Sequence, residues 1–250
     1  MDERSIGADM TEQAHAVVVI PTYNERDNLE RLVKALRAHA YRVLVVDDAS
    51  PDGTGDLADT LSAADPMVSV VHRTEKAGLG PAYAHGFAVA LEGSEAVVCQ
   101  MDADFSHDPD ALPELVAHVV DGADLAIGSR YVPGGSTPDW KLIRRLISRG
   151  GNIYARIMLG QKVRDMTGGF RAWSRAGLEA ADPQTSHASG YAFQVETAWR
   201  TLRAGCVVVQ HPITVIDRAY GDSKMDSAIV AEATRLVTSW GIRRLTRRLP

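Results

Sequence analysis

The chain has 250 residues, of which 45% are hydrophobic and 24% charged, and its formal net charge is -5. This composition is typical of a soluble globular protein, and the acidic balance argues against a nucleic-acid partner because phosphate neutralisation requires a basic surface. Its two cysteines, Cys99 and Cys206, lie far apart beside apolar runs, which favours buried thiols in the cytosol over a disulfide framework. No apolar stretch reaches the roughly 20 residues that span a bilayer. We expect residues 1–14 to form a flexible leader.

Short β-branched runs alternate with helical periodicity through the first half of the chain. Continuous apolar runs predict strands, buried on both faces, at AVVVI (16–20), RVLVVD (42–47), MVSVV (67–71) and AVVCQM (96–101). Helices are predicted between and after them, around residues 29–36, 57–61, 81–91 and 110–120. This alternation predicts an α/β fold with an open, mostly parallel twisted sheet flanked by helices.

The regular alternation ends near residue 128. The loop GSRYVPGGSTPDW (128–140) precedes a predicted helix over about 141–159, and the motif RDMTGGFRAW (164–173) follows that helix. A helix over about 193–202, the strand VVVQHPITVI (207–216) and a helix from about residue 226 come next. We therefore expect a nucleotide-binding half over about 15–128, an acceptor-handling half over about 129–225 and a C-terminal amphipathic helix over 226–250.

Polar clusters follow three of the four predicted strands. PTYNE (21–25) follows the first strand, DDASPDGT (47–54) the second and MDAD (101–104) the fourth. Open α/β sheets bind ligands at the carboxyl ends of their strands, so these clusters are expected to converge in one crevice. Asp47 is placed either to accept hydrogen bonds from a base or ribose or to form a turn, and Asp52 or Thr54 is expected to cap the next helix.

Asp102 and Asp104 stand two positions apart directly after the fourth strand. Alternate carboxylates there can point into one site and bind a hard divalent cation such as Mg2+ or Mn2+. The alternative is a solvated turn, which is the usual meaning of an isolated Asp-x-Asp. Ser106, one further step of two, can add a hydroxyl or water-mediated contact, whereas Asp108 is expected to start the helix after Pro109.

Two basic segments follow the last predicted strand. The loop DRAYGDSK (217–224) supplies Arg218 and Lys224, cationic donors that suit a diphosphate leaving group; the alternative is an exposed charged loop. In SWGIRRLTRRLP (239–250), aliphatic side chains occupy one helical face and arginines the other. That pattern fits either a helix lying on anionic lipid or a terminal helix docked on the domain.

The polar motifs, taken together and in order, resemble those of the family 2 glycosyltransferases of the GT-A fold. The motifs are PTYNE, DDASPDGT, KAGLGPAYAHG, MDADFSHDP, GSRYVPGG, DMTGGFR, QVE and DRAYGDSK, and they run from about residue 16 to residue 224. More narrowly, they are similar to those of the dolichol-phosphate mannose synthases, called polyprenol monophosphomannose synthases in bacteria. The resemblance implies an inverting transfer of mannose from GDP-mannose to the phosphate of a membrane polyprenol, with Mg2+ or Mn2+ as the metal.

The resemblance also implies roles for individual residues. On the donor side it implies Pro21, Tyr23, Glu25, Asp47, Asp52, Asp102, Ala103, Asp104, Gln194, Glu196, Arg218 and Lys224. As metal ligands it implies Asp102, Asp104 and Ser106, the last at a position that is Gln in many relatives. For the acceptor phosphate it implies Arg130, Arg144, Ser148 and Arg171, and for catalysis Asp104, Arg130, Arg144, Arg218 and Lys224. Which arginine meets which phosphate is not fixed by the sequence.

A phosphate acceptor is already an oxyanion near neutral pH, so alignment and charge neutralisation replace a general base. The chain is expected on the cytoplasmic face of the membrane, held through the C-terminal helix, through apolar positions between residues 140 and 159, or through a membrane-embedded partner protein. Two alternatives keep the fold: a glucosyl- or N-acetylglucosaminyltransferase that uses a UDP-sugar, and a non-catalytic nucleotide-sugar binding module. An NAD-linked oxidoreductase is disfavoured because the glycine pattern after the third strand is incomplete.

Overall fold

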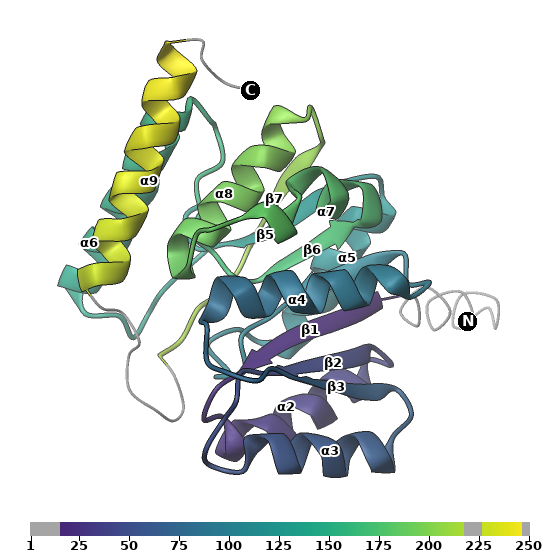
Figure 1. Cartoon of the computed structure of the whole chain (residues 1–250). Coiled ribbons are helices and arrows are strands. Elements are labelled where there is room, and N and C mark those ends of the chain that lie inside the picture. The colour runs from purple at the N-terminus through teal and green to yellow at the C-terminus, as the bar shows by residue number, and fades with distance from the viewer. Residues whose placement is uncertain (1–15, 218–226, 247–250) are drawn as a thin grey trace.

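The computed structural model describes residues 16–217 and 227–246. Within these residues the centre is a seven-stranded sheet in the order β3-β2-β1-β4-β6-β5-β7 (Figure 1). Strand β6 is antiparallel to both of its neighbours, β4 and β5, and the other pairings are parallel. The strands are β1 (Ala16–Thr22), β2 (Arg42–Asp47), β3 (Val68–His72), β4 (Val97–Gln100), β5 (Leu125–Ser129), β6 (Arg171–Ser174) and β7 (Val208–Pro212).

The strand order creates a crevice at the end of β1. Strand β1 pairs with β2 on one side and with β4 on the other, with Thr22 opposite Asp47 and Val19 opposite Gln100. The chain runs outward from β1 through β2 to β3 and then crosses back to β4. The carboxyl ends of β1 and β4 therefore form a topological switch point, which is where open α/β sheets bind ligands. The polar clusters predicted from the sequence lie at this edge.

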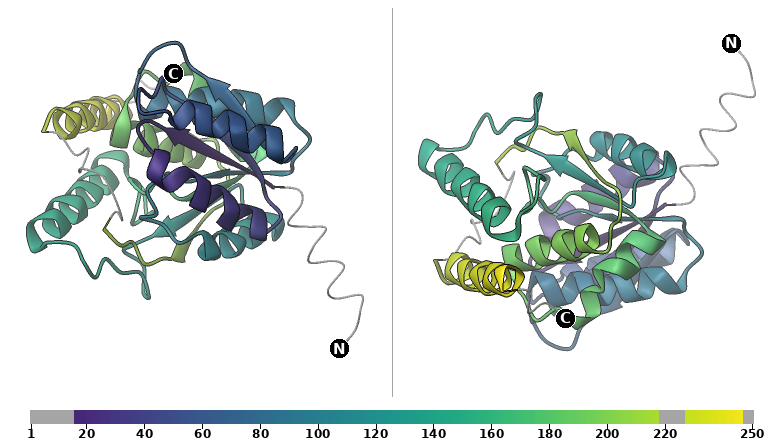
Figure 2. Two further views of the ribbon diagram at one scale, coloured as in Figure 1. Left: turned by 90° about the horizontal axis from the view of Figure 1, so that it is seen from below. Right: turned by 90° about the horizontal axis from the view of Figure 1, so that it is seen from above.

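Helices cover both faces of the sheet (Figures 1 and 2). The core on one face includes α2 (Arg26–Ala38), α3 (Thr54–Ala64) and α5 (Leu112–Val120), which follows the short 3-10 helix Pro109–Ala111. The core on the other face includes α4 (Leu79–Glu92), α7 (Arg175–Ala181) and α8 (Gly190–Arg203), with the 3-10 helix Pro183–Thr185 before α8. The predicted stripe of α2 is buried: Leu29, Leu32 and Leu36 are completely enclosed, and Val33 is 3% exposed.

Helix α4 lies unusually close to β1 and β2. A Cβ atom at Gly86 would overlap a methyl carbon of Val19 and would lie 2.8 Å from one of Val46, so this approach requires glycine. Tyr83, nearly one turn earlier, is fully buried, with its ring stacked 5.6 Å from that of Phe87 between centroids. The close packing brings the Tyr83 hydroxyl to the end of β4, where it contacts the carboxylate of Asp102.

Helices α6 (Leu142–Leu159) and α9 (Ser227–Leu245) pack side by side, and α9 also packs against α8 (Figures 1 and 2). The hydroxyl oxygens of Tyr154 in α6 and Thr238 in α9 are 2.5 Å apart. Much of α6 faces solvent with large aliphatic side chains, namely Leu142, Ile143, Leu146, Ile147, Ile153 and Ile157, which are 45% to 71% exposed. Across the described ranges, none of the helices combines the length and apolarity needed to traverse a bilayer.

The α/β class, the mostly parallel sheet and the four strands predicted in the first half are confirmed. Burial of β3 on both faces is wrong, because β3 is an edge strand and Ser69, Val70 and Val71 are partly exposed. The sequence did not predict β5, β6 or α7. Because β6 inserts between β4 and β5, residues on both sides of position 128 build one sheet.

Candidate active site

A cavity of about 530 Å³ opens at the carboxyl ends of β1, β2 and β4. Its walls come from segments far apart in the sequence: the end of β1, the loop before α4, the turn after β4, the loop before β6 and the start of α8. Of the sequence-predicted donor residues, the cavity is lined by Pro21, Tyr23, Glu25, Asp102, Ala103, Asp104 and Gln194. The tertiary structure thus brings most of the predicted donor side together.

Asp102 and Asp104 both line this cavity, and neighbouring groups orient them. The Tyr83 hydroxyl donates to Oδ1 of Asp102 at 2.8 Å, and the backbone N–H of Ser106 donates to Oδ1 of Asp104 at 3.0 Å. Asp104 is 5% exposed, so its carboxylate is held in a largely dry wall. Burial, together with the Asp102 charge, raises the pKa of Tyr83 well above its usual value, which keeps the hydroxyl protonated as a donor.

The two carboxylates fit a divalent metal that is shared with a substrate. Among the described residues, no group of three or more His, Cys, Asp or Glu side chains could hold a metal ion by itself. Mg2+ and Mn2+ prefer oxygen ligands, and Mg2+ is commonly bound through one or two carboxylates with substrate phosphates supplying the rest. Asp102 and Asp104 on one cavity wall meet that description. Ser106 does not line the cavity; its backbone N–H, as described above, orients Asp104.

Asp47 and Asp48, the acidic pair at the end of β2, have different surroundings, which the sequence did not predict. Asp47 accepts hydrogen bonds from the hydroxyls of Thr22 (3.2 Å) and Ser50 (2.6 Å) and does not line the cavity. Asp48 does line it, and its carboxylate accepts from Arg73 Nη1 at 2.6 Å and from the backbone N–H of Gly78 at 3.0 Å. Asp48 therefore fixes the loop before α4 as part of the cleft wall.

Of two further residues predicted on the donor side, Tyr23 lines the cavity and Asp52 does not. Asp52 does not line the cavity; it accepts from the backbone N–H and the hydroxyl of Thr54 at 3.0 and 2.6 Å, at the start of α3. Tyr23 does line it, and the Lys76 ammonium lies 3.7 Å from the centre of its ring. An ammonium over an aromatic face is an attractive contact, and here it places a cation on the cleft wall.

Gln194 and Glu196 face different cavities. The side-chain oxygen of Gln194 accepts from Gln100 Nε2 at 2.7 Å, while its own buried Nε2 has no hydrogen-bond partner among the described residues. A buried amide donor left unpaired beside a cavity is suited to a polar ligand. Glu196 lies on the opposite side of α8, where it accepts from Arg200 Nη2 at 2.5 Å and lines a second cavity.

Arg130 is bound within the protein by a buried carboxylate. Its Nε and Nη2 donate to the two oxygens of Asp165 at 2.7 and 2.6 Å, and Nη2 also donates to the Thr167 hydroxyl at 2.8 Å. Burial alone would raise the pKa of Asp165, but the Arg130 guanidinium and its hydrogen bonds hold that pKa below the usual value. Thr167 lines the main cavity, so this pair supports the cleft wall from behind.

Arg171 lies inside the core rather than on the cleft wall. It is completely buried, and its guanidinium donates to the backbone oxygens of Gly168, Met166 and Gln194 at 2.8 to 2.9 Å. Burial lowers its pKa to about 9. These hydrogen bonds connect the loop before β6 to α8. Because the Arg171 side chain is completely buried, it has no exposed surface that could contact an acceptor phosphate, the role that the resemblance implied.

Arg144 and Ser148 lie on α6, outside the cavity walls. The Arg144 guanidinium stacks 3.9 Å from the Trp140 ring centre and pairs with the carboxylate of Asp217. The Ser148 hydroxyl accepts from Tyr131 at 2.6 Å. The predicted loop residues Arg218 and Lys224 lie outside the described residues.

Sequence reasoning missed Asp48, Lys76 and Tyr83 as parts of the site. Asp48 had a signal, because it adjoins Asp47 at the same strand end, but the direction of each side chain depends on the local backbone. Lys76 stands in the glycine-containing motif after β3, which the sequence predicts as a tight turn close to ligand. Tyr83 had no signal, since its place on an apolar helix face resembles core packing.

The chain belongs to glycosyl transferase family 2, whose family model matches residues 17–181. It is 49% identical over 231 residues to the polyprenol monophosphomannose synthase of Mycolicibacterium smegmatis, with 91% of this chain and 87% of that protein covered. It is also 49% identical over 228 residues to the undecaprenyl-phosphate mannosyltransferase of Micrococcus luteus, with 90% and 93% covered.

A solved structure shares the fold at low sequence identity. Glucosyl-3-phosphoglycerate synthase of Mycobacterium tuberculosis, in complex with Mn2+, UDP and glucosyl-3-phosphoglycerate, superposes with a TM-score of 0.66 at 21% identity, covering 98% of this chain and 85% of that one. The predicted family and GT-A fold are therefore confirmed, and the chain is a glycosyltransferase.

Proposed function

We propose that this protein transfers mannose from GDP-mannose to the phosphate of a membrane polyprenol, with inversion at the anomeric carbon, releasing GDP. The observation that carries the proposal is the cavity at the ends of β1 and β4, which is lined both by Asp102 and Asp104 and by residues of the PTYNE segment (21–25). The two relatives at 49% identity, whose names specify mannose and a polyprenol or undecaprenyl phosphate, support the sugar and the acceptor.

Asp102 and Asp104 would hold Mg2+ or Mn2+ in the proposed site, and the metal would supply charge neutralisation for the departing diphosphate. The Mn2+ in the glucosyl-3-phosphoglycerate synthase complex supports a divalent ion. Tyr83 and the backbone of Ser106 set the positions of the two carboxylates before substrate arrives. Gln194 offers its unpaired amide to the donor from the opposite wall. Arg218 and Lys224 remain part of the proposal as cations for the diphosphate.

The acceptor phosphate is assigned to Arg144, with Ser148 one turn further along α6. A guanidinium binds phosphate well because its donors match oxyanion geometry. Arg144 is partly exposed and already pairs with an acidic group, Asp217, that a phosphate would replace. Arg130 acts through Asp165 and Thr167 as a positioning residue. Since the attacking phosphate oxygen is already anionic, the site aligns it without removing a proton.

Helix α6 is the surface that we assign to the membrane. Its exposed aliphatic side chains, Leu142, Ile143, Leu146, Ile147, Ile153 and Ile157, are flanked by Lys141, Arg144, Arg145, Arg149 and Arg156. Aliphatic groups beside lysines and arginines are typical of a helix that lies in the interface of an anionic bilayer. This placement brings Arg144 to the level of lipid headgroups, on the cytoplasmic face where the nucleotide sugar is available.

A donor-specific transfer assay tests the function. Purified protein is incubated with a short polyprenyl phosphate and Mg2+ or Mn2+, and GDP-mannose is compared with UDP-glucose and UDP-N-acetylglucosamine. We expect transfer only from GDP-mannose and loss of activity on chelation. Transfer only from a UDP-sugar would overturn the mannose assignment, and binding of nucleotide sugar without any transfer would favour a non-catalytic module.

Vesicle sedimentation tests the membrane surface. The variant Ile143→Glu/Ile157→Glu should lose binding to phosphatidylglycerol vesicles, whereas the control Val120→Glu, at an exposed aliphatic position on α5, should bind as wild type does. Failure of the wild-type protein to bind protein-free vesicles would instead indicate a membrane-embedded partner protein.

A further inference from the structure

The segment 186–191, which leads into α8, forms one wall of the cleft. Its residues Ser189, Gly190 and Tyr191 line the main cavity together with Gln194, which lies one turn further along α8. A wall that a substrate touches is best fixed from outside the cavity, because groups that fixed it from inside would occupy the space of the substrate. The contacts on the outer side of this segment therefore decide the shape of the cleft.

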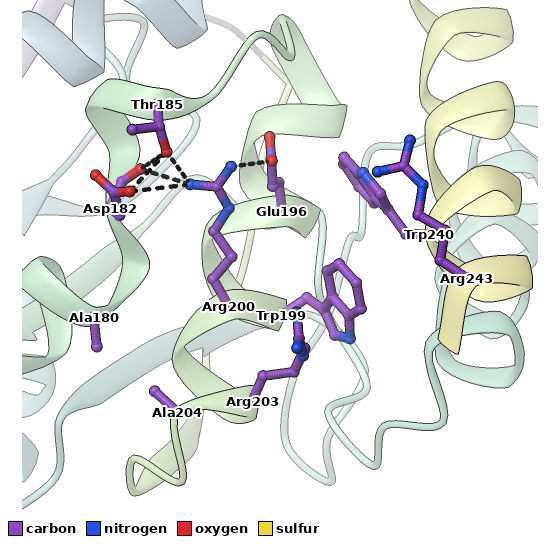
Figure 3. A pocket seen from close by; sticks show the side chains of 10 residues that line it. All are labelled: Ala180, Asp182, Thr185, Glu196, Trp199, Arg200, Arg203, Ala204, Trp240 and Arg243. Atoms are coloured by element: carbon purple, nitrogen blue, oxygen red, sulfur yellow. Dashed lines mark hydrogen bonds and ion pairs between the residues drawn. The ribbon is translucent and has the colours of Figure 1, made fainter. Parts of the chain in front are cut away.

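The first half of the segment is held by α8 itself and by α4. The Ser186 hydroxyl donates to Oε2 of Glu196 at 2.5 Å. Arg200 Nη2 donates to the other oxygen of the same carboxylate, also at 2.5 Å (Figure 3). A Cβ atom at Gly80 of α4 would lie 2.5 Å from the Ala188 backbone oxygen, so the segment packs directly on the backbone of α4. Residues 186–188 are thus fixed by neighbours on two helices.

The second half of the segment is held by Glu232 of α9. The backbone N–H of Ser189 donates to Oε1 of Glu232 at 3.1 Å, and the Ser189 hydroxyl donates to Oε2. Ser189 is the N-cap residue of α8, and an N-cap serine commonly accepts from an N–H group of its own helix. Within the described residues its side chain makes no such bond, because the hydroxyl points to Glu232. A carboxylate near the N-terminus of a helix is also favourable for the helix dipole.

Ile229, nearly one turn before Glu232 on α9, contacts the same place through apolar atoms. It lines the main cavity, and a Cβ atom at Gly190 would lie 3.0 Å from its Cγ2. Gly190 has a φ of +50°, a backbone conformation that glycine adopts without strain. Helix α9 therefore meets the start of α8 with one polar and one apolar side chain.

Helix α9 is a firm support for this wall, because it packs on two other helices. The ring of Trp240 stacks on that of Trp199 in α8, with 5.7 Å between the ring centres (Figure 3), and both indoles are buried or nearly so, at 9% and 4% exposed. On the side of α6, the hydroxyl oxygens of Thr238 and Tyr154 are 2.5 Å apart. Glu232 thus joins the cleft wall to a helix that other contacts already hold in place.

We propose that Glu232 is a positioning residue of this glycosyltransferase, which through Ser189 holds the start of α8 where the substrate meets it. Without the carboxylate, the N–H and the hydroxyl of Ser189 lose their acceptor, and the wall populates other positions. The apparent affinity for substrate then falls with the fraction of molecules whose wall is in place. Turnover of the bound complex is little changed, because Glu232 itself does not line the cavity. The inference rests on the proposed function only in the choice of GDP-mannose as the donor.

Steady-state kinetics of transfer from GDP-mannose to a short polyprenyl phosphate test this role. We expect Glu232→Ala to raise KM for GDP-mannose by about five- to tenfold, with kcat within about twofold of wild type. Glu232→Gln should recover most of the affinity, because its amide can accept from the Ser189 N–H and donate to the Ser189 hydroxyl. Glu179→Ala, which removes an exposed glutamate of α7 away from the cavity, is the matched control and should behave as wild type does.

Amide hydrogen exchange without substrate gives a second readout, which does not depend on the donor. Exchange of residues 189–193 should be about tenfold faster in Glu232→Ala than in wild type, because a charged hydrogen bond is lost, and should return toward the wild-type rate in Glu232→Gln. Should Glu232→Ala fail to fold, Glu232→Asp, whose carboxylate is one methylene shorter, should show the same changes to a smaller degree.

An unchanged KM in Glu232→Ala, with or without faster exchange, would overturn the inference, and so would a loss confined to kcat. A Glu232→Gln protein as impaired as Glu232→Ala would overturn the hydrogen bonds to Ser189 as the cause. If wild type transfers only from a UDP-sugar, the proposed function fails, whereas KM for that UDP-sugar and the exchange of residues 189–193 still decide the role of Glu232.

Discussion

Two polar motifs of this protein, Asp102–Asp104 after β4 and Asp165–Arg171 leading into β6, place their charged side chains in opposite ways. The first motif presents both carboxylates to a cavity and orients them with one hydroxyl and one backbone N–H. The second turns its charges inward, where Asp165 binds Arg130 and Arg171 binds backbone oxygens. A polar motif in a glycosyltransferase can therefore serve by contact with substrate or by shaping the wall that substrate meets.

The largest effect should come from removing the cavity-facing carboxylate of Asp104. We expect Asp104→Ala to lower kcat/KM by about 10³-fold, because in the proposed function this carboxylate would help to hold the metal that neutralises the departing diphosphate. Thermal stability should change little. The matched control is Asp108→Ala, because Asp108 lies in the same segment but does not line the cavity, and its carboxylate accepts from the backbone N–H of Asp110 at the start of a 3-10 helix. A radiolabelled sugar transfer assay checks both variants, and full activity in Asp104→Ala would end the metal-site assignment.

Substitution in the inward-facing motif, Asp165–Arg171, should lower the stability of the fold. Asp165→Asn leaves the buried Arg130 without its counter-ion and should cost about 3–5 kcal/mol of unfolding free energy, measured in urea. Asp110→Asn, whose side chain is 80% exposed, should cost less than about 1 kcal/mol. A wild-type-like stability in Asp165→Asn would show that the buried pair is not a structural support.

The contribution of Asp165 to the free energy of unfolding should depend on pH. The pKa of Asp165 is lowered in the folded state, so its contribution to stability is complete above its unfolded pKa of about 3.9 and is lost as the pH falls through the lower folded value. Asp165→Asn should lack that acid component. Urea midpoints measured from pH 6 downward will test this, and parallel acid limbs in the two proteins would contradict it.

A smaller effect on activity is expected from Tyr83, whose hydroxyl supports Asp102. Tyr83→Phe removes the hydrogen bond to Asp102 but keeps the aromatic stacking, so kcat/KM should fall by roughly three- to tenfold, in line with a net hydrogen-bond worth of about 1 kcal/mol. The metal concentration for half-maximal rate should rise, because Asp102 loses its orientation. A lower rate with unchanged metal dependence would mean that Tyr83 acts on packing alone.

The smallest effect is expected at Ser106. Its backbone N–H, not its hydroxyl, holds Asp104, and the residue does not line the cavity. Ser106→Ala should therefore keep activity within about twofold, as is usual for a substitution away from any critical contact. Metal titration of the transfer rate provides the measurement, and a loss comparable with that of Asp104→Ala would support the predicted role of Ser106 as a metal ligand.

Much of the fold could be predicted because its signals are local. The runs 16–20 and 42–47 and the stripe of α2 carry their period in consecutive residues, and all three were found close to their observed bounds. Strand β6 could not be predicted, since the four residues Arg171–Ser174 carry no period and form a strand only between β4 and β5. The direction of Asp48 into the cavity, and of Glu196 away from it, likewise depends on the backbone around each residue.

The sequence by itself determined the family, the α/β class and the strand ends at which the carboxylates Asp102 and Asp104 stand, because these follow from short motifs and hydrophobic period. Only the tertiary structure decided which polar groups face ligand. Asp48 lines the cleft, and the buried Tyr83 donates to Asp102 from behind the cleft wall. Arg171 is enclosed in the core, and α8 separates Gln194 from Glu196 into two cavities. The physical reason is that burial and hydrogen bonding of a side chain are set by neighbours distant in the chain, which no local pattern records.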